Sequence, residues 1–234
     1  MKRRLLVAAV CLPALLAACA TPRTAADDAA IHRVTVIPLI AESGTVDKLG
    51  FTVFNNARTT IAQGGALNRQ AMETVGQALR ASRPGWTIVP ATADFPSLAA
   101  RLEKLDFFGG DLAKVQADID AIMKATGADA VVVVSDLTPE NVAGRGVGVR
   151  LRTLPGATPR LTAYAHLYVE LRDPAGHRLS GFAGIAEKDL DARSLGVTGD
   201  LESVETPAVR ARLSEAMRDQ ADRAISDALQ RQGY

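Results

Sequence analysis

Cysteine is almost absent from this sequence of 234 residues. The only two, Cys11 and Cys19, both lie within the first twenty residues. The rest of the chain can therefore form neither a disulfide nor a metal site with thiolate ligands. Its three histidines, His32, His166 and His177, do not have the spacing of a metal motif with one another or with a carboxylate. We therefore expect no metal centre and no cofactor.

Aromatic residues and excess charge are also scarce. Aromatic side chains make up 4% of the sequence and Trp86 is the only tryptophan, which argues against a platform for stacked bases or sugars. Lys and Arg number 27 against 26 Asp and Glu, so no positive charge excess favours nucleic acid as a partner. The hydrophobic share of 47% is that of a globular domain plus one apolar segment.

The apolar segment is at the start of the chain. Three cations, Lys2, Arg3 and Arg4, precede a run from Leu5 to Ala18 that is interrupted only by Pro13. Fourteen residues are too few to cross a bilayer as a helix, which takes about 20, so the pattern predicts a signal peptide over residues 1–18. Its removal takes the formal net charge from +1 to −2.

The end of this run resembles the lipobox of bacterial lipoprotein precursors. It reads Leu16-Ala17-Ala18-Cys19. The resemblance implies that the thiol of Cys19 takes a diacylglyceryl group before cleavage and that the mature protein carries palmitate-type chains, two of which suffice for stable anchoring. Cys11 lies inside the apolar run and has no leucine three positions before it, so we expect no modification there. An ordinary secretory signal with an incidental cysteine remains the alternative.

The residues after Cys19 predict the location and the domain boundaries. Ala20 follows the cysteine, and by resemblance to enteric lipoproteins this implies the outer membrane, with the protein facing the periplasm. Residues 19–30 are small and polar and are expected to be a tether. Residues 31–234 show no internal repeat and no linker, which predicts a single periplasmic domain.

Hydrophobic periodicity within this domain predicts a mixed α/β (α+β) fold, with antiparallel hairpins and helices mainly on one face of the sheet. The first two predicted strands are expected to form a hairpin, and the apolar run at Ala130–Val134 is expected to be a central strand. The predicted strands are Val34–Ile40, Gly50–Phe54, Trp86–Val89, Ala130–Val134, Gly144–Leu151, Leu161–Arg172 and Leu179–Glu187, and the predicted helices are Leu67–Ala81, Ser97–Leu105, Asp111–Gly127 and Thr206–Gln230.

Catalytic motifs are weak. Ser135-Asp136 follows the predicted central strand, where ligands of α/β proteins often bind, but it lacks the glycines of a nucleophile elbow. The series Gly144-x-Gly146-x-Gly148 lacks the spacing and the following helix of a phosphate loop, so close packing is the favoured interpretation. An envelope hydrolase or transferase acting on glycan or lipid, using Ser135, Asp136 and His166, is kept as the alternative function.

Two sets of side chains are candidate partner-binding residues. The predicted strand Leu161–Arg172 alternates an apolar row with a row that contains Tyr164, His166 and Tyr168, and tyrosine is enriched in protein interfaces. The second set is a basic patch that includes Arg145 and Arg150, which would suit an anionic partner. The simpler interpretation of the tyrosine row is a sheet face that is exposed to water or covered by a loop. The simpler interpretation of the basic patch is that its arginines lie on the solvent side of a hairpin.

The combined pattern resembles a group of uncharacterised proteobacterial lipoproteins. It consists of the lipobox, the tether, Gly50-Phe51-Thr52-Val53-Phe54-Asn55-Asn56, and Gly127 to Val134 after a helix. The fold that the resemblance implies is similar to that of penicillin-binding-protein activator lipoproteins and of the amino-terminal domain of the translocation protein TolB. Such lipoproteins act by contact, so the resemblance implies a non-catalytic protein, held at the membrane by its lipid anchor, that binds or scaffolds an envelope protein.

Overall fold

The computed structural model describes residues 29–103, 112–139 and 144–234. The predicted signal peptide, Cys19, most of the tether and the predicted start of a helix at Asp111 lie outside the described residues. Residues Ile31–Tyr234 form one compact unit. Its elements are β1 (Arg33–Leu39), β2 (Ser43–Leu49), the 3-10 turn η1 (Val53–Asn55), β3 (Ala57–Ala62), α2 (Ala66–Ser82), β4 (Thr87–Val89), α3 (Phe95–Glu103), η2 (Leu112–Lys114), α4 (Gln116–Thr126), β5 (Ala130–Asp136), β6 (Gly146–Arg152), β7 (Arg160–Arg172), β8 (Arg178–Leu190), α5 (Leu201–Val204) and α6 (Pro207–Arg231).

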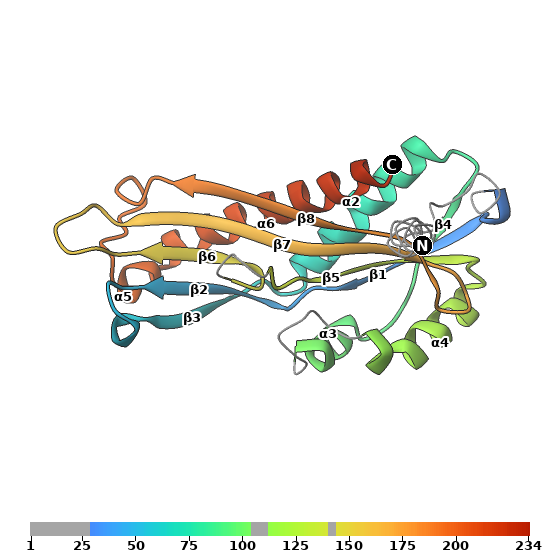
Figure 1. The fold of residues 1–234 in the computed structure, drawn as a ribbon, viewed down its shortest axis with the longest axis horizontal. Helices are drawn as coiled ribbons and strands as arrows, with labels where there is room; N and C mark the ends of the chain where they lie inside the picture. The colour runs from blue at the N-terminus through green and yellow to red at the C-terminus, as the bar shows by residue number, and fades with distance from the viewer. Residues whose placement is uncertain (1–28, 104–111, 140–143) are drawn as a thin grey trace, which may run out of the picture. The chain divides into compact units, whose positions relative to one another are not determined.

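The eight strands form one mixed sheet, which confirms the predicted α/β class (Figure 1). β7 and β8 are the longest strands, with 13 residues each. β8 pairs with one side of β7, and β6 and β5 pair with successive halves of its other side, all antiparallel. β2 runs parallel to β6, and β1 runs parallel to β5. β1 and β2 therefore lie end to end in one row, with β4 beside β1 and β3 beside β2.

The predicted strand at Gly50–Phe54 and its hairpin with the first strand are wrong. The hairpin is formed instead by β2 and β3, and residues 50–56 are the connection between them, including the turn η1. β1 pairs with β4 and β5, both parallel. The cause is that β2 is not an apolar run: it reads SGTVDKL, and its polar side chains have partners only in the folded sheet.

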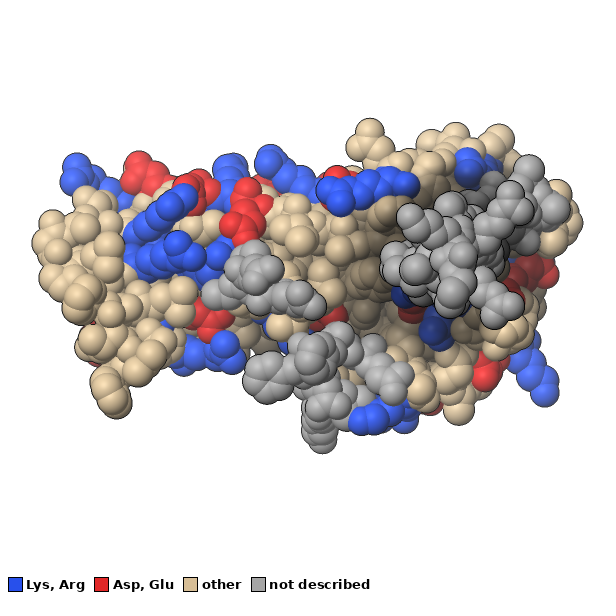
Figure 2. All heavy atoms as spheres, in the orientation of Figure 1, with Lys and Arg blue, Asp and Glu red and all other residues tan. Residues whose placement is uncertain are grey.

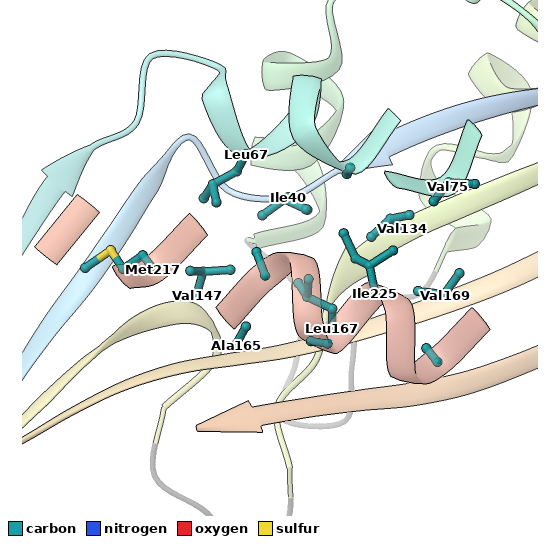
Figure 3. Close-up of a cluster of buried hydrophobic side chains, with 14 of the residues drawn as sticks. Ile40, Leu67, Val75, Val134, Val147, Ala165, Leu167, Val169, Met217 and Ile225 are labelled. Carbon is teal, nitrogen blue, oxygen red and sulfur yellow. The ribbon is translucent and has the colours of Figure 1, made fainter. Parts of the chain in front are cut away.

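The main hydrophobic core lies between one face of the sheet and the two longest helices, α2 and α6. Figure 3 shows side chains of this core from β5, β6 and β7, such as Val134, Val147 and Leu167, facing Leu67 of α2 and Ile225 of α6. α6 runs along β7 and β8 and also packs against α2. Thr206 accepts a hydrogen bond from the backbone N–H of Val209 and caps this helix, which begins where the sequence predicted it.

A second, smaller core covers part of the opposite face. Ile37 and Leu39 of β1 and Val131 and Val133 of β5 pack there against α3 and α4. β5 is buried along its whole length, as the sequence predicted for a central strand. Gly127 ends α4 in the left-handed region at φ 61°. The rest of this face, over β6, β7 and β8, is not covered by these helices and holds polar side chains.

One buried polar residue in the main core lacks partners. Gln220 of α6 is fully buried, and within the described part of the chain neither its amide nitrogen nor its amide oxygen has a hydrogen-bond partner. Burying an amide without a hydrogen bond costs about 1–3 kcal/mol. We therefore expect Gln220→Met to raise the free energy of unfolding by about 1 kcal/mol, measured by urea denaturation.

Gln63 is the matched control for this prediction, because it is also buried but its amide is hydrogen-bonded. Its oxygen accepts from Ser214 Oγ at 2.8 Å, and its nitrogen lies 3.4 Å from the Ile61 carbonyl oxygen. Gln63→Met should lower the free energy of unfolding, since it leaves these groups without a partner. Equal effects at the two positions would contradict the assignment of Gln220 as an unpaired amide.

Candidate functional site

The tyrosine row of β7 is not the open surface that its pattern suggested. Tyr164 and His166 have no exposed surface, and Glu170 is 5% exposed. Arg150, expected in a basic patch or on the solvent side of a hairpin, is also only 5% exposed. The expectation of an open docking face is therefore wrong at Tyr164, His166 and Arg150, because these side chains are packed against one another on the polar face of β6, β7 and β8.

Three glycines at alternate positions make this packing possible. A Cβ atom on Gly144 or Gly148 would lie 2.5 Å from the ring or hydroxyl of Tyr164, and a Cβ on Gly146 would lie 2.5 Å from a carboxylate oxygen of Asp136. Gly144 and Gly146 also have positive φ, at 106° and 60°. Gly144 and Gly148 thus form a slot for the tyrosine ring and Gly146 makes room for Asp136, which agrees with the close-packing interpretation of the sequence.

The hydroxyl of Tyr164 is held by β2. Its Oη lies 2.8 Å from Thr45 Oγ1 and 3.2 Å from Asp47 Oδ2, and the other oxygen of Asp47 accepts from Arg58 Nε of β3. Burial is the main cause that raises the pKa of Tyr164 above its ordinary value of 10.0, and the neighbouring Asp47 carboxylate raises it further. The phenol is therefore a neutral structural link between β7 and β2.

His166 and Arg150 share one carboxylate. His166 stacks on Tyr164 with ring centroids 4.9 Å apart; its Nδ1 is 3.2 Å from the Gly144 carbonyl oxygen and its Nε2 is 3.3 Å from Glu187 Oε1. Arg150 forms an ion pair with the same Glu187 oxygen, and its guanidinium carbon is 5.2 Å from the centroid of the Tyr164 ring. Glu187 of β8 thus balances the charge of the buried Arg150, and the face of the Tyr164 ring stabilises that charge further.

The tyrosine link leads to a stability prediction. Tyr164→Phe removes a hydroxyl that Thr45 and Asp47 bond, so at neutral pH the free energy of unfolding should fall by about 1–3 kcal/mol. Because the folded protein raises the pKa, the unfolded tyrosine ionises first, and this stabilisation is lost as the pH rises above 10.0. The difference between the two proteins in urea melts should therefore shrink above that pH. A constant difference from neutral pH upward would contradict the buried neutral phenol.

The remaining partner-binding candidates are partly exposed. Tyr168 is half-buried, and its hydroxyl accepts a hydrogen bond from Arg178 Nη1 at 3.0 Å. Arg145 is also half-buried, and its Nη2 donates to the Leu102 carbonyl at 3.3 Å. A role in partner binding for these two residues remains a prediction.

The residues considered for hydrolysis are not arranged around an open site. Ser135 and Asp136 are 8% and 7% exposed, and Asp136 Oδ2 accepts from the backbone N–H of Ala41. Both ring nitrogens of His166 lie within hydrogen-bond distance of acceptors in the fold. A histidine that acts as a general base needs a ring nitrogen that reaches the substrate. The geometry therefore gives the hydrolase or transferase alternative no support.

An exposed apolar feature, which the sequence pattern missed, lies at one end of the sheet. Phe51, Val53 and Phe54 in the β2–β3 connection are 72%, 75% and 94% exposed, and Leu154 in the β6–β7 connection is 58% exposed. We call these four residues the apolar end. The two connections adjoin, since the Thr153 N–H donates to the Leu49 carbonyl at 3.0 Å. The flanking Gly50 and Asn55-Asn56, which favour turns, were the signal against a strand here.

The described residues offer neither a membrane span nor a metal cluster. No helix in residues 29–103, 112–139 and 144–234 is long and apolar enough to cross a membrane. In the same ranges, no group of three or more His, Cys, Asp or Glu side chains is placed to hold a metal ion.

Comparison with known proteins gives distant similarities only. No family profile matches the sequence, and no curated protein matches it. Similar solved structures include the LpoB C-terminal domain from Salmonella enterica (15% identity over 74% of this chain and 90% of that chain, TM-score 0.27). Others are the lipoprotein GNA1162 from Neisseria meningitidis (12%, 81% and 96%, TM-score 0.31) and the PelC dodecamer from Paraburkholderia phytofirmans (12%, 83% and 89%, TM-score 0.28). At these TM-scores the similarities assign neither a family nor a function.

Proposed function

We propose that this protein is a lipid-anchored lipoprotein of the cell envelope that acts by binding or scaffolding an envelope protein rather than by catalysis. The observation that carries the proposal is the sequence Leu16-Ala17-Ala18-Cys19 at the end of a signal-peptide-like segment. Ala20 after the cysteine supports an outer-membrane location facing the periplasm.

The geometry of the domain supports action by contact. The polar side chains that the sequence offered for chemistry, His166 above all, are buried and engaged with other groups of the fold. The described residues also expose the apolar end, and exposed apolar side chains that gather at one place are typical of surfaces that contact a protein or a membrane. The partner is expected to be another component of the envelope.

The lipid anchor is tested by Cys19→Ala. We expect this variant to lose metabolic labelling with palmitate and to remain uncleaved or to appear as a soluble form, because acyl transfer requires the thiol. Cys11→Ala is the matched control, since Cys11 lies within the apolar run and should be removed with it. Undiminished labelling of Cys19→Ala would show that the anchor lies elsewhere or does not exist.

A further inference from the structure

The apolar end is the most exposed cluster of large hydrophobic side chains among the described residues. None of the residues of η1 is buried, and Phe54 within it is 94% exposed. Two phenylalanines, a valine and a leucine on adjoining connections give a compact apolar surface that water covers in the isolated domain. Transfer of such side chains out of water is favourable. The other exposed large hydrophobic side chains of the described residues, Phe182 and Ile185 of β8, are only 41% and 48% exposed, so the driving force for association is strongest at the apolar end.

The tips of the two connections that carry these side chains hold no charge. Residues 49–56 and residues 153–159 contain no Lys, Arg, Asp or Glu, and charged residues such as Lys48 and Arg152 come just before them. The connection between β8 and α5, residues 191–200, packs against residues 153–159, and its Arg193 lines the same surface hollow. In the face that Figure 2 shows, this end of the sheet is largely tan, and charged side chains of both signs are set back from it. The two uncharged tips can therefore enter an apolar medium without desolvating an ion.

The shape of this end favours contact with a lipid leaflet over contact with a folded protein. Phe54 projects on a turn between two strands, with almost its whole side chain in solvent, so the surface is convex. A protein partner would need a cavity shaped to this projection, whereas a lipid leaflet adapts to it. Lys48, at the base of the connection, is already paired with Asp200 at 2.9 Å, so it does not mark this end for an acidic protein surface.

The apolar end can reach the membrane in which the lipid anchor would be inserted. The domain begins at Ile31, at the end of the sheet where β1 starts, and the apolar end lies at the opposite end, where β7 starts. β7 has 13 residues and spans about 43 Å. The eleven residues from Ala20 to Ala30 extend at most about 40 Å. A domain lying along the membrane can thus touch it at both ends, and the anchor raises the effective concentration of the leaflet at the apolar end.

We propose that Phe51, Val53, Phe54 and Leu154 insert into the phospholipid leaflet that holds the lipid anchor, as a second membrane contact that orients the domain. This inference rests on the proposed lipid anchor. It adds a contact at the opposite end of the sheet, so that the domain lies along the membrane and presents the remaining surface to its envelope partner.

Tryptophan fluorescence of the acylated full-length protein tests the insertion. The protein is reconstituted in vesicles of phosphatidylethanolamine and phosphatidylglycerol, with or without brominated acyl chains. Phe54→Trp should shift its emission to shorter wavelength on vesicles and lose most of that emission to the brominated lipids. Phe182→Trp is the matched control, since Phe182 is 41% exposed on β8 opposite Val169, away from the apolar end, and should be neither shifted nor quenched. Trp86 gives the same background in both variants and is subtracted with the wild-type signal.

The outcomes separate this inference from the proposed function. An acylated, vesicle-bound protein whose Phe54→Trp emission is unquenched overturns the insertion and leaves the anchor standing. A protein without acyl chains overturns the anchor; quenching of Phe54→Trp in that protein would still support insertion, and its absence would overturn both. In cells, a photo-crosslinking residue at position 54 should yield lipid adducts, and a discrete protein adduct there would overturn the proposal in favour of a protein partner.

Discussion

Gly184→Ala is expected to destabilise the domain severely. Gly184 lies on β8 where α6 crosses it, and a Cβ atom there would stand 1.8 Å from the backbone oxygen of Ala224 and 2.6 Å from its carbonyl carbon. Both obstructing atoms belong to helix backbone, so no side-chain rotation relieves the overlap. The helix would have to move away from β8 along a contact that closes the main core.

We expect the free energy of unfolding to fall by about 3 kcal/mol or more, at the upper end of the usual cost of overpacking, measured by urea denaturation followed by circular dichroism. Gly85→Ala is the matched control. A Cβ on Gly85 meets no atom within 4 Å, and its backbone is not in the left-handed region, so its stability should change little. Wild-type stability of Gly184→Ala would mean that α6 does not approach β8 this closely.

Leu213→Asp is expected to have the second large effect. Leu213 of α6 has no exposed surface and belongs to the main core. The substitution removes a buried aliphatic side chain and places a carboxyl group in apolar surroundings, so the residue must either bury a charge or take up a proton. We expect a loss of about 5 kcal/mol or more, comparable with the whole stability of many domains, and hence no cooperative melting transition.

Ala211→Asp, two residues earlier on the same helix, is the control for this substitution. Ala211 is exposed and lies in the second turn from the N-terminus of α6, where the helix dipole tolerates a negative charge. Its melting transition should stay close to that of the wild type. An unaltered transition of Leu213→Asp would show that α6 is peripheral to the core.

Most elements of the fold follow from the sequence because their signals are local. β5 contains the apolar run Ala130–Val134, α6 begins at Thr206-Pro207, and α4 ends at Gly127; each of these signals depends on a few neighbouring residues. The turn of residues 173–176 likewise forms at Asp173, Pro174 and Gly176, residue types that favour turns, with Gly176 at φ 81°. The mixed α/β class required no more than these patterns.

Local sequence patterns could not predict which strands pair with one another. Phe51-Thr52-Val53-Phe54 has strong strand propensity, yet it is a connection, because the strand that pairs with β6 and β3 is the more polar β2. Thr45 and Asp47 stabilise a strand at β2 only when Tyr164 and Arg58 lie beside them as hydrogen-bond partners. These contacts join residues far apart in the chain, and no window of the sequence contains both partners.

The alternation of β7 determined from the sequence alone that one row of its side chains enters the main core, and that row, from Leu161 to Leu171, is buried there. Only the tertiary structure decided whether the side chains of the other row are buried or exposed. Tyr164 and His166 are buried because Gly144 and Gly148 leave room for the tyrosine ring and because Glu187 and Arg150 compensate each other beside it. Period two distinguishes the two faces of a strand, but solvent access depends on what the neighbouring strands place above each face.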